Sequence, residues 1–329
     1  MKKIGIIGGG SWATAIAKII LNNAENINWW IRNAESVDYF KTYYQNPHYL
    51  SSVHFNPNQI NITNDFNEVI ENSEIIIWAI PAAFIHETIS KYDLSSLKEK
   101  LHVTTIKGIV PEFTCTVTEY LNSTYNVPNQ SFAMIAGPCH AEEVAMEKLS
   151  MLTIATTNDE LSTLMPKLLT CRYIKVNKLN DLRGVEYAAV LKNIFAVAAG
   201  ICSGLNYGDN FMAILTVNAI KEAERFLEII CPTKRDVINS AYLGDIIVTC
   251  YSQFSRNRIF GTLIGKGYSV KYSMIEMKMV AEGYYAVKNI KQINKNLNVD
   301  MPIIDAVYNI LYENISPGME IKILAEKLS

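Results

Sequence analysis

The feature that most constrains the fold is an alternation of short apolar runs with helical patterns, which continues to about Leu179 and then stops. Runs that are apolar on both faces are typical of strands covered on both sides of a sheet. Because helical patterns separate these runs, the first half of the chain predicts a mostly parallel α/β sheet. The expected strands are Ile4–Ile7, Ile27–Ile31, Glu74–Ile80, His102–Ile106, Phe132–Ala136, Met151–Thr156 and Arg172–Val176.

Beyond Leu179 the sequence keeps a helical periodicity that glycines interrupt. We therefore expect two domains in the 329 residues, an α/β domain over 1–179 and an all-α domain over 180–329. This agrees with a usual domain size of about 150 residues. The stretch from Tyr39 to Asn67 fits no strong periodic pattern, and we expect a long loop with short helical pieces there.

The overall charge excludes some classes of function. Thirty Lys and Arg against 32 Asp and Glu leave a net charge of -2, which gives no broad basic field for binding nucleic acid. No charge-free apolar run reaches the ~18 residues of a membrane span, and Gly8 ends the first run too early for a signal peptide. Six scattered cysteines without a Cys-x-x-Cys pair predict reduced thiols in a cytoplasmic protein, and no metal site.

A Gly-x-Gly-x-x-Ala motif, Gly8 to Ala13, lies between the first strand and the first helix. Gly8 permits a tight turn, Gly10 lets the backbone approach a pyrophosphate, and Ala13 allows the helix to pack closely on the strand. The helix N-terminus adds free N–H groups and a positive dipole end. An ordinary glycine-rich turn is the alternative, but the strand–turn–helix context favours a dinucleotide site.

The residues after the second strand bear on the choice of cofactor. A fold selective for NAD would place Asp or Glu there, whereas this chain has Arg32-Asn33. A guanidinium can pair with a 2′-phosphate, so the sequence favours NADP over NAD. Alternatively, Arg32 stacks on the adenine of either cofactor. Lys107 follows a later strand and is either a solvated lysine or a charge partner for a phosphorylated ligand.

Lys192 lies in the middle of the helix that we expect from Val185 to Ala199, which is apolar nearly all round and therefore buried. Ala188, Ala196 and Gly200 lie four or eight positions away, and we expect this stripe of small residues to leave space over the ammonium group. Desolvation lowers the pKa of a lysine and suits it to proton exchange near neutral pH. The alternative is a lysine whose ammonium group extends to the surface.

A second motif, Ser255-Arg256-Asn257, begins a helical pattern in the second half. Ser255 is a good N-cap, so Arg256 and Asn257 would occupy the first turn. The helix dipole disfavours a cation at this end unless an anion binds there, so we expect a phosphate site rather than a plain surface helix start.

Taken together, the motifs resemble those of bacterial NAD(P)-dependent glycerol-3-phosphate dehydrogenases. Their order and spacing over nearly the whole chain are more specific than any one motif. The matching segments are Gly8-Gly9-Gly10-Ser11-Trp12, Lys107-Gly108, Ala136-Gly137-Pro138, Leu191-Lys192-Asn193-Ile194, Leu243-Gly244-Asp245, Ser255-Arg256-Asn257-Arg258 and Glu282-Gly283.

The resemblance implies a Rossmann domain with a mostly parallel, doubly wound sheet, followed by an all-α domain like the C-terminal part of 6-phosphogluconate dehydrogenase. It implies interconversion of sn-glycerol 3-phosphate and dihydroxyacetone phosphate for phospholipid synthesis, with Lys192 as the catalytic proton acceptor and Asp245 beside it. It also implies a homodimer. The implied substrate residues are Lys107, Gly137, Cys139, Lys192, Asp245, Ser255, Arg256 and Asn257. Besides Gly8 and Gly10, the implied cofactor residues are Ser11, Trp12, Arg32, Lys107, Ala141, Arg256, Val280 and Glu282.

The chain departs from the family pattern at three places. Cys139 and His140 stand where the family has a hydroxyl residue and commonly Phe, and a thiol is a weak donor. Ala13 replaces the commoner third glycine, and the segment Ile214–Asn218 lacks the Arg-Gly of many relatives. Two other functions remain open from the sequence: a related dehydrogenase of β-hydroxy acids or phosphogluconate, and a non-catalytic NAD(P)H sensor.

Overall fold

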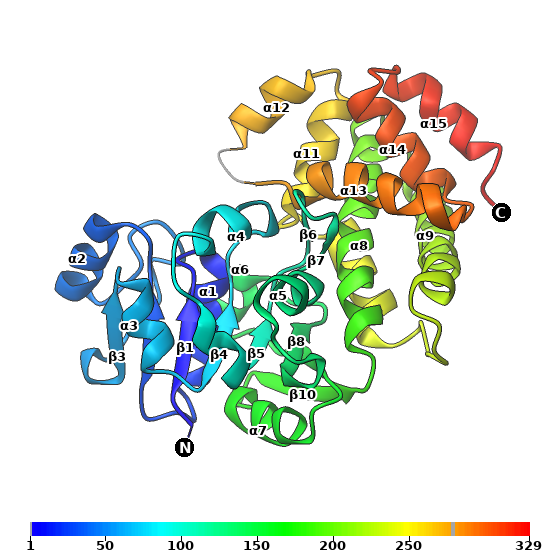
Figure 1. The fold of residues 1–329 in the computed structure, drawn as a ribbon. Coiled ribbons are helices and arrows are strands. Elements are labelled where there is room, and N and C mark those ends of the chain that lie inside the picture. The colour runs from blue at the N-terminus through cyan, green and yellow to red at the C-terminus, as the bar shows by residue number, and fades with distance from the viewer. Residues whose placement is uncertain (1, 278–279) are drawn as a thin grey trace. The chain divides into compact units, whose positions relative to one another are not determined.

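The computed structural model describes residues 2–277 and 280–329, and the chain forms two compact units (Figure 1). The sheet unit contains Met1–Ile106 and Val117–Leu182, and the helical unit contains Lys107–Thr116 and Arg183–Ser329. The domain boundary expected at 179/180 stays a prediction. That boundary assigns Lys107–Thr116 to the first domain, whereas in the structure this segment groups with the helices of the second half of the chain.

The sheet unit is built on eight strands in the order β10-β9-β8-β5-β4-β1-β2-β3. All neighbouring pairs are parallel except β8 and β9, which are antiparallel. The sheet grows from β1 in one direction and from β4 in the other, so the carboxyl ends of β1 and β4 flank the switch point where ligands bind in such folds. The strands are β1 (Ile4–Ile7), β2 (Ile27–Trp30), β3 (Ile60–Thr63), β4 (Ile75–Trp78), β5 (Leu101–Thr104), β8 (Phe132–Ala136), β9 (Ser150–Ala155) and β10 (Ile174–Leu179).

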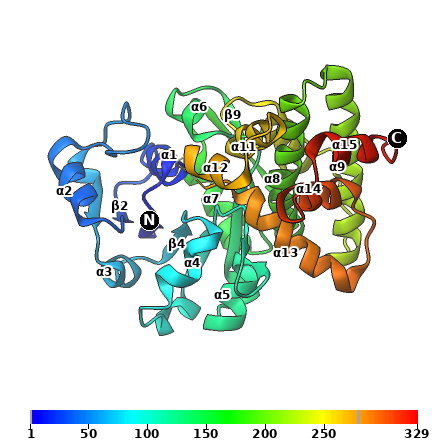
Figure 2. The ribbon, with the colours of Figure 1, turned by 90° about the horizontal axis from the view of Figure 1, so that it is seen from above.

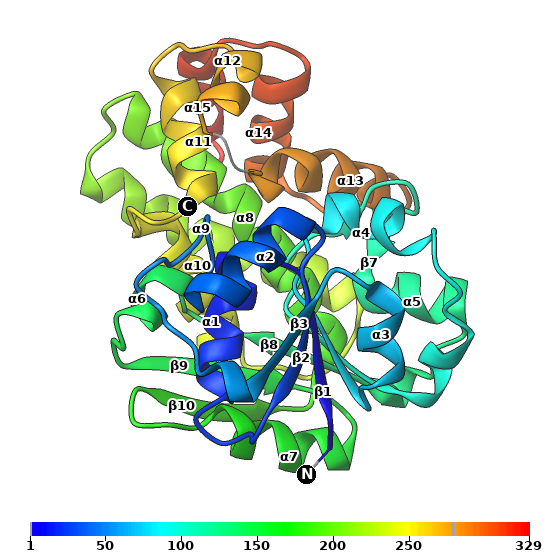
Figure 3. The ribbon, with the colours of Figure 1, turned by 90° about the vertical axis from the view of Figure 1, so that its left-hand side faces the viewer.

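Helices cover both faces of this sheet, as expected for strands that are apolar on both sides. Figures 2 and 3 show α1 and α6 on one face and α3, α4 and α5 on the other. The helices are α1 (Ser11–Ile20), α2 (Ala34–Tyr43), α3 (Phe66–Glu71), α4 (Ala82–Ile89), α5 (Val117–Tyr125), α6 (Ala141–Ala145) and α7 (Asp159–Leu169). The doubly wound α/β prediction is confirmed.

The stretch from Tyr39 to Asn67 is more ordered than expected. It contains the end of α2, a loop over residues 44–56, a 3₁₀ turn at Pro57–Gln59, and β3 at the sheet edge. The expectation of a loop with short helical pieces missed β3, although its Ile-Asn-Ile-Thr sequence alternates as an edge strand does. The buried ring of Phe55 packs edge-to-face on Trp29 of β2, with their centroids 5.6 Å apart.

The helical unit is arranged around α8 (Leu182–Gly204), which is buried along nearly its whole length. A short antiparallel pair, β6 (Ile109–Val110) and β7 (Cys115–Thr116), belongs to the same unit. The other helices are α9 (Asp209–Ile230), α10 (Asp245–Tyr251), α11 (Arg256–Gly265), α12 (Val270–Glu276), α13 (Glu282–Leu297), α14 (Pro302–Tyr312) and α15 (Pro317–Ala325). A π-helical turn, Ser240–Gly244, precedes α10.

Glycines let α8 and α11 approach each other closely. A Cβ on Gly200 would lie 2.1 Å from the carbonyl oxygen of Arg258, and one on Gly261 would lie 2.1 Å from that of Val197. The expectation that Gly200 leaves space over the lysine is therefore wrong, because the backbone of α11 occupies that space. The small residue serves helix packing at this position.

Among the described residues, α8 is the one helix long and apolar enough to cross a membrane. Its most apolar 18-residue window is 100% buried inside the protein. This burial is typical of a core helix.

Candidate active site

The glycine turn after β1 has the backbone geometry that a dinucleotide site needs. Gly8 has φ +134°, and a Cβ there would lie 2.3 Å from the carbonyl oxygen of Ala79 after β4, so only glycine fits. By contrast, a Cβ on Gly10 would meet nothing within 4 Å, which leaves open space in front of the turn. Ser11 and Trp12 form the first residues of α1 directly behind this space.

The donors of this turn match an anionic ligand. The N–H groups of Gly9 and Gly10 donate to no atom of residues 2–277 and 280–329. The N-terminus of α1 contains no acidic residue in its first turn, so nothing there repels a phosphate. A pyrophosphate placed against Gly10 would receive these hydrogen bonds and the positive end of the helix dipole. The turn therefore fits the NAD(P) pyrophosphate on backbone geometry alone.

Arg32 follows β2 and is exposed, without an acidic partner in the described part of the chain. Its neighbour Asn33 caps α2, because its side chain accepts from the N–H groups of Glu35 at 2.8 Å and Ser36 at 3.3 Å. The side chain of Asn33 is therefore engaged in capping α2, whereas the guanidinium of Arg32 makes no hydrogen bond to a described residue.

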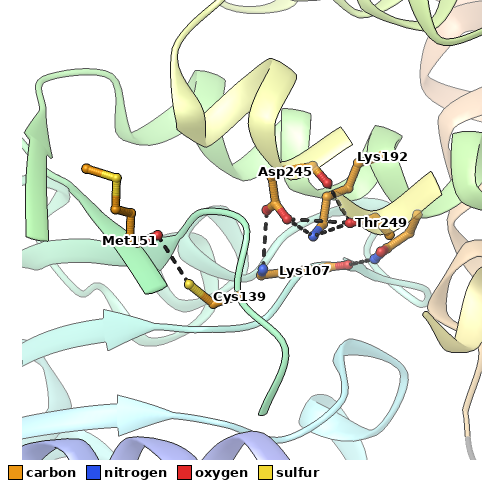
Figure 4. Close-up of polar contacts among 7 residues, drawn as sticks. Lys107, Cys139, Met151, Lys192, Asp245 and Thr249 are labelled. Atoms are coloured by element: carbon orange, nitrogen blue, oxygen red, sulfur yellow. Dashed lines mark hydrogen bonds and ion pairs between the residues drawn. The ribbon is translucent and has the colours of Figure 1, made fainter. Parts of the chain in front are cut away.

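The Gly137-Pro138-Cys139 turn after β8 is also tightly constrained. Gly137 has φ +111°, and a Cβ there would lie 2.8 Å from the carbonyl oxygen of Met151. The thiol of Cys139 donates to this same oxygen at 3.2 Å (Figure 4). The sulfur is thus engaged with β9, where a substrate contact was expected. Ala141, at 6% exposure, is the first residue of α6.

In the helical unit, Lys192 lies at the centre of a buried polar cluster, as Figure 4 shows. Its Nζ donates to Oδ1 of Asp245 and, at 3.0 Å, to Oγ1 of Thr249. Lys107 approaches the other carboxylate oxygen of Asp245 at 3.3 Å. We call these four residues the lysine–aspartate cluster. Asn193 supports the cluster, because its Nδ2 donates to the carbonyl oxygen of Lys107 at 2.7 Å.

The cluster places two ammonium groups on one carboxylate. Burial lowers the pKa of Lys192 to about 7; the carboxylate of Asp245 opposes this change, and the ammonium of Lys107 adds to it. Burial alone would raise the pKa of Asp245, but Lys107 and Lys192 together hold it below its usual value. Asp245 therefore stays ionised, while Lys192 can gain and lose a proton near neutral pH.

Thr249 is a member of the cluster that the sequence reasoning missed. Its hydroxyl donates to the carbonyl oxygen of Asp245 at 2.6 Å, one helical turn earlier in α10. Because this uses its only proton, its lone pairs face the Lys192 ammonium as acceptors. The spacing of four residues from Asp245 to Thr249 on one helix face was a usable signal for this role.

The start of α11 brings together the expected phosphate residues. The Ser255 hydroxyl accepts from the N–H of Arg258 at 3.3 Å and caps the helix, as expected. Arg256 is exposed, and its guanidinium makes no hydrogen bond or ion pair with a described residue. The side-chain oxygen of Asn257 accepts from the N–H of Gly283 at 2.9 Å, which ties this turn to the start of α13.

The predicted site residues thus fall into two sets. The lysine–aspartate cluster, the start of α11, Val280 and Glu282 belong to the helical unit. Val280 is half-buried, and Glu282 begins α13 next to the glycine that Asn257 contacts. The sheet unit contains Gly8, Gly10, Ser11, Trp12, Arg32, Gly137, Cys139 and Ala141.

Comparison with known proteins shows one family along the whole chain. Residues 3–162 match the N-terminal model of NAD-dependent glycerol-3-phosphate dehydrogenase, and residues 181–322 match the C-terminal model. A Staphylococcus aureus glycerol-3-phosphate dehydrogenase (NAD(P)+) is 34% identical over 330 aligned residues, covering 99% of this chain and 98% of the relative. A Staphylococcus epidermidis relative of the same name is 32% identical over 99% of this chain and 98% of its own.

The crystal structure of glycerol-3-phosphate dehydrogenase from Coxiella burnetii superposes with a TM-score of 0.90 at 27% identity, covering 99% of both chains. The similarity in sequence therefore extends to the arrangement of strands and helices. On the family models and on these full-length relatives, the chain belongs to the NAD-dependent glycerol-3-phosphate dehydrogenase family.

Proposed function

We propose that the chain interconverts sn-glycerol 3-phosphate and dihydroxyacetone phosphate with NAD(P) as cofactor. The observation that carries this proposal is the buried ammonium of Lys192, which Asp245 and Thr249 hold and whose pKa burial lowers to about 7. Such a group exchanges a proton at neutral pH, as the oxidation of a secondary alcohol or the reduction of a ketone requires. Family membership supports the choice of substrate.

Lys192 is the proposed general base for alcohol oxidation and, when protonated, the general acid for ketone reduction. Asp245 and Thr249 occupy two acceptor directions around its Nζ. Since an ammonium has three protons, one direction stays available for the hydroxyl or carbonyl oxygen at C2 of the substrate. Asp245 also holds Lys107, which places a second positive charge where substrate oxygens could be bound.

The start of α11 is the proposed site for the substrate phosphate. Within residues 2–277 and 280–329, neither the Arg256 guanidinium nor the amide nitrogen of Asn257 donates a hydrogen bond, while the amide oxygen of Asn257 accepts from Gly283. Ser255 can still donate its hydroxyl proton while it caps the helix. Charge-assisted hydrogen bonds of this kind position a substrate for reaction. We also assign substrate contacts to Gly137 and Cys139, although both donors of Cys139 are engaged: its N–H donates to the oxygen of Gly137 at 2.9 Å and its thiol to that of Met151 at 3.2 Å.

The cofactor is proposed to lie against the glycine turn of the sheet unit, and its nicotinamide supplies or accepts the hydride when bound. NADP is favoured over NAD, since the exposed Arg32 can pair with a 2′-phosphate. The remaining proposed cofactor residues are Gly8, Gly10, Ser11, Trp12, Lys107, Ala141, Arg256, Val280 and Glu282.

The decisive experiment is reduction of dihydroxyacetone phosphate by the purified protein with NADH and, separately, with NADPH. Turnover with either cofactor is expected, with a higher kcat/KM for NADPH. Absence of turnover with both, together with normal binding of NADPH, would contradict the catalytic proposal and favour a sensor. Arg32→Asp is expected to reverse the cofactor preference, and an unchanged preference would remove Arg32 from that role.

The proposal extends to the cellular role. An enzyme of this activity supplies glycerol 3-phosphate for phospholipid synthesis, and we place it in the cytoplasm as a homodimer. Size-exclusion chromatography with light scattering tests the dimer, since a monomeric mass at assay concentration would contradict it.

A further inference from the structure

The three successive carbonyl groups of the glycine turn all accept hydrogen bonds, those of Gly8 and Gly9 from segments distant in the sequence and that of Gly10 from the first turn of α1. Nε1 of Trp29 donates to the oxygen of Gly8 at 2.7 Å. The side chain of Asn46 donates to the oxygen of Gly9 at 3.0 Å. The oxygen of Gly10 accepts from both the backbone N–H and the hydroxyl of Thr14, each at 3.0 Å.

These bonds determine where the N–H groups of the turn point. A trans peptide is planar, and its carbonyl and the next N–H point in opposite directions. The donor to each oxygen therefore fixes the N–H of the following residue: Trp29 fixes that of Gly9, and Asn46 fixes that of Gly10. Glycine peptides rotate more freely than others, so a glycine-rich turn needs this restraint most.

Asn46 comes from the 44–56 loop and is 2% exposed. Its Nδ2 donates to Oγ1 of Thr14 at 2.9 Å as well as to Gly9. Its Oδ1 accepts from the backbone N–H groups of His48 at 3.0 Å and Tyr49 at 3.1 Å. The full hydrogen-bonding capacity of the amide is thus used: the oxygen binds the loop, and the nitrogen binds the glycine turn and α1.

We infer that Asn46 is a positioning residue for the dinucleotide, which orients the Gly10 N–H toward the pyrophosphate by holding the Gly9 carbonyl on the opposite side. This inference rests on the proposed cofactor site. It also gives a role to a loop that the sequence motifs left unexplained. A residue that only anchored the loop would need the Oδ1 contacts to His48 and Tyr49 but not the donor contact to Gly9.

The test compares two variants with the full-length wild-type chain. Asn46→Ala removes the contacts of Oδ1 with the loop as well as those of Nδ2 with Gly9 and Thr14. Asn46→Ser keeps a short oxygen that can accept from the loop N–H groups but cannot reach Gly9, so it separates the two roles and protects the loop fold. Asn56→Ala is the matched control, because Asn56 caps the Pro57–Gln59 turn at the end of the same loop and its side chain accepts from Asn58.

Binding of NADH and NADPH is measured by cofactor fluorescence, and stability by thermal unfolding. Both Asn46 variants are expected to raise the cofactor Kd by about tenfold, equivalent to ~1.4 kcal/mol, with Asn56→Ala unchanged. The KM for the cofactor is expected to rise more than kcat falls. A lower Tm with an unchanged cofactor Kd in both Asn46 variants would overturn the inference and show that Asn46 only anchors the loop. If the wild-type chain bound neither cofactor, the proposed function would fail instead.

Discussion

Replacing Lys192 by Met tests the central chemistry with little change in shape. The side chain keeps a similar length inside α8, but the ammonium and its bonds to Asp245 and Thr249 are lost. A positioned acid–base group typically contributes 10²–10⁴ in rate. At 1.36 kcal/mol for each factor of ten, the barrier should rise by about 3–5 kcal/mol.

The fold should tolerate this substitution. Removing one partner of a buried ion pair usually costs about 3–5 kcal/mol because the remaining charge is left unpaired. Here Asp245 keeps Lys107 at 3.3 Å, so its carboxylate retains a counter-charge. We therefore expect a smaller loss in the free energy of unfolding, and cofactor binding close to that of the wild-type chain.

The pH dependence provides a second readout of the same variant. With a Lys192 pKa of about 7, ketone reduction needs the protonated form, so its kcat/KM should fall as the pH rises through 7. Alcohol oxidation needs the neutral form, so its kcat/KM should rise over the same interval. In Lys192→Met both of these changes should disappear.

The assay follows NAD(P)H absorbance with dihydroxyacetone phosphate, and in reverse with sn-glycerol 3-phosphate, across pH values on both sides of 7. Lys322→Met is the control, because Lys322 is exposed on α15 in the same unit. A kcat in Lys192→Met within tenfold of the wild-type value would refute the assignment. Persistence of the change near pH 7 would assign that titration to another group.

Three further predictions concern binding and stability. Arg256→Ala should raise the KM for dihydroxyacetone phosphate at least tenfold with a smaller change in kcat, and an unchanged KM would place the phosphate elsewhere. Gly200→Ala should lower the free energy of unfolding by about 1–3 kcal/mol, because its Cβ would lie 2.1 Å from a carbonyl oxygen; Gly208→Ala, where a Cβ meets nothing within 4 Å, is the control in urea titrations. Glu222→Ala should cost about 2–4 kcal/mol, since its carboxylate accepts from the N–H groups that begin α14 at 2.9 and 3.0 Å. Glu222→Gln keeps one acceptor and should cost less in the same titration.

Local sequence patterns were sufficient to predict most strands of the sheet unit. β1 and β8 have the bounds expected for them, because their apolar runs are bordered by a glycine turn or a clear change in polarity. The short strands β6 and β7, with two residues each, carry no periodicity that a sequence pattern could reveal. The antiparallel pairing of β8 with β9 depends on contacts between segments rather than on either segment alone.

For the candidate site, the sequence indicated which residue types matter but not how they contact one another. The burial of Lys192 followed from the apolar helix around it. Its contact with Asp245 joins residues 53 positions apart, and that of Lys107 with Asp245 joins residues 138 apart. Such pairings depend on tertiary packing, which also explains why Gly200 proved to be a packing position.

The assignment of Lys107–Thr116 to the helical unit affects how the protein can be synthesised and divided. During translation this segment is synthesised well before α8 and α10. The contacts of Lys107 with Asn193 and Asp245 can therefore form only after those two residues have left the ribosome. Splitting the gene near residue 180 would leave Lys107 on the wrong fragment. A version for studying that unit alone should join residues 107–116 to residues 183–329 through a linker, because residues 117–182 belong to the sheet unit.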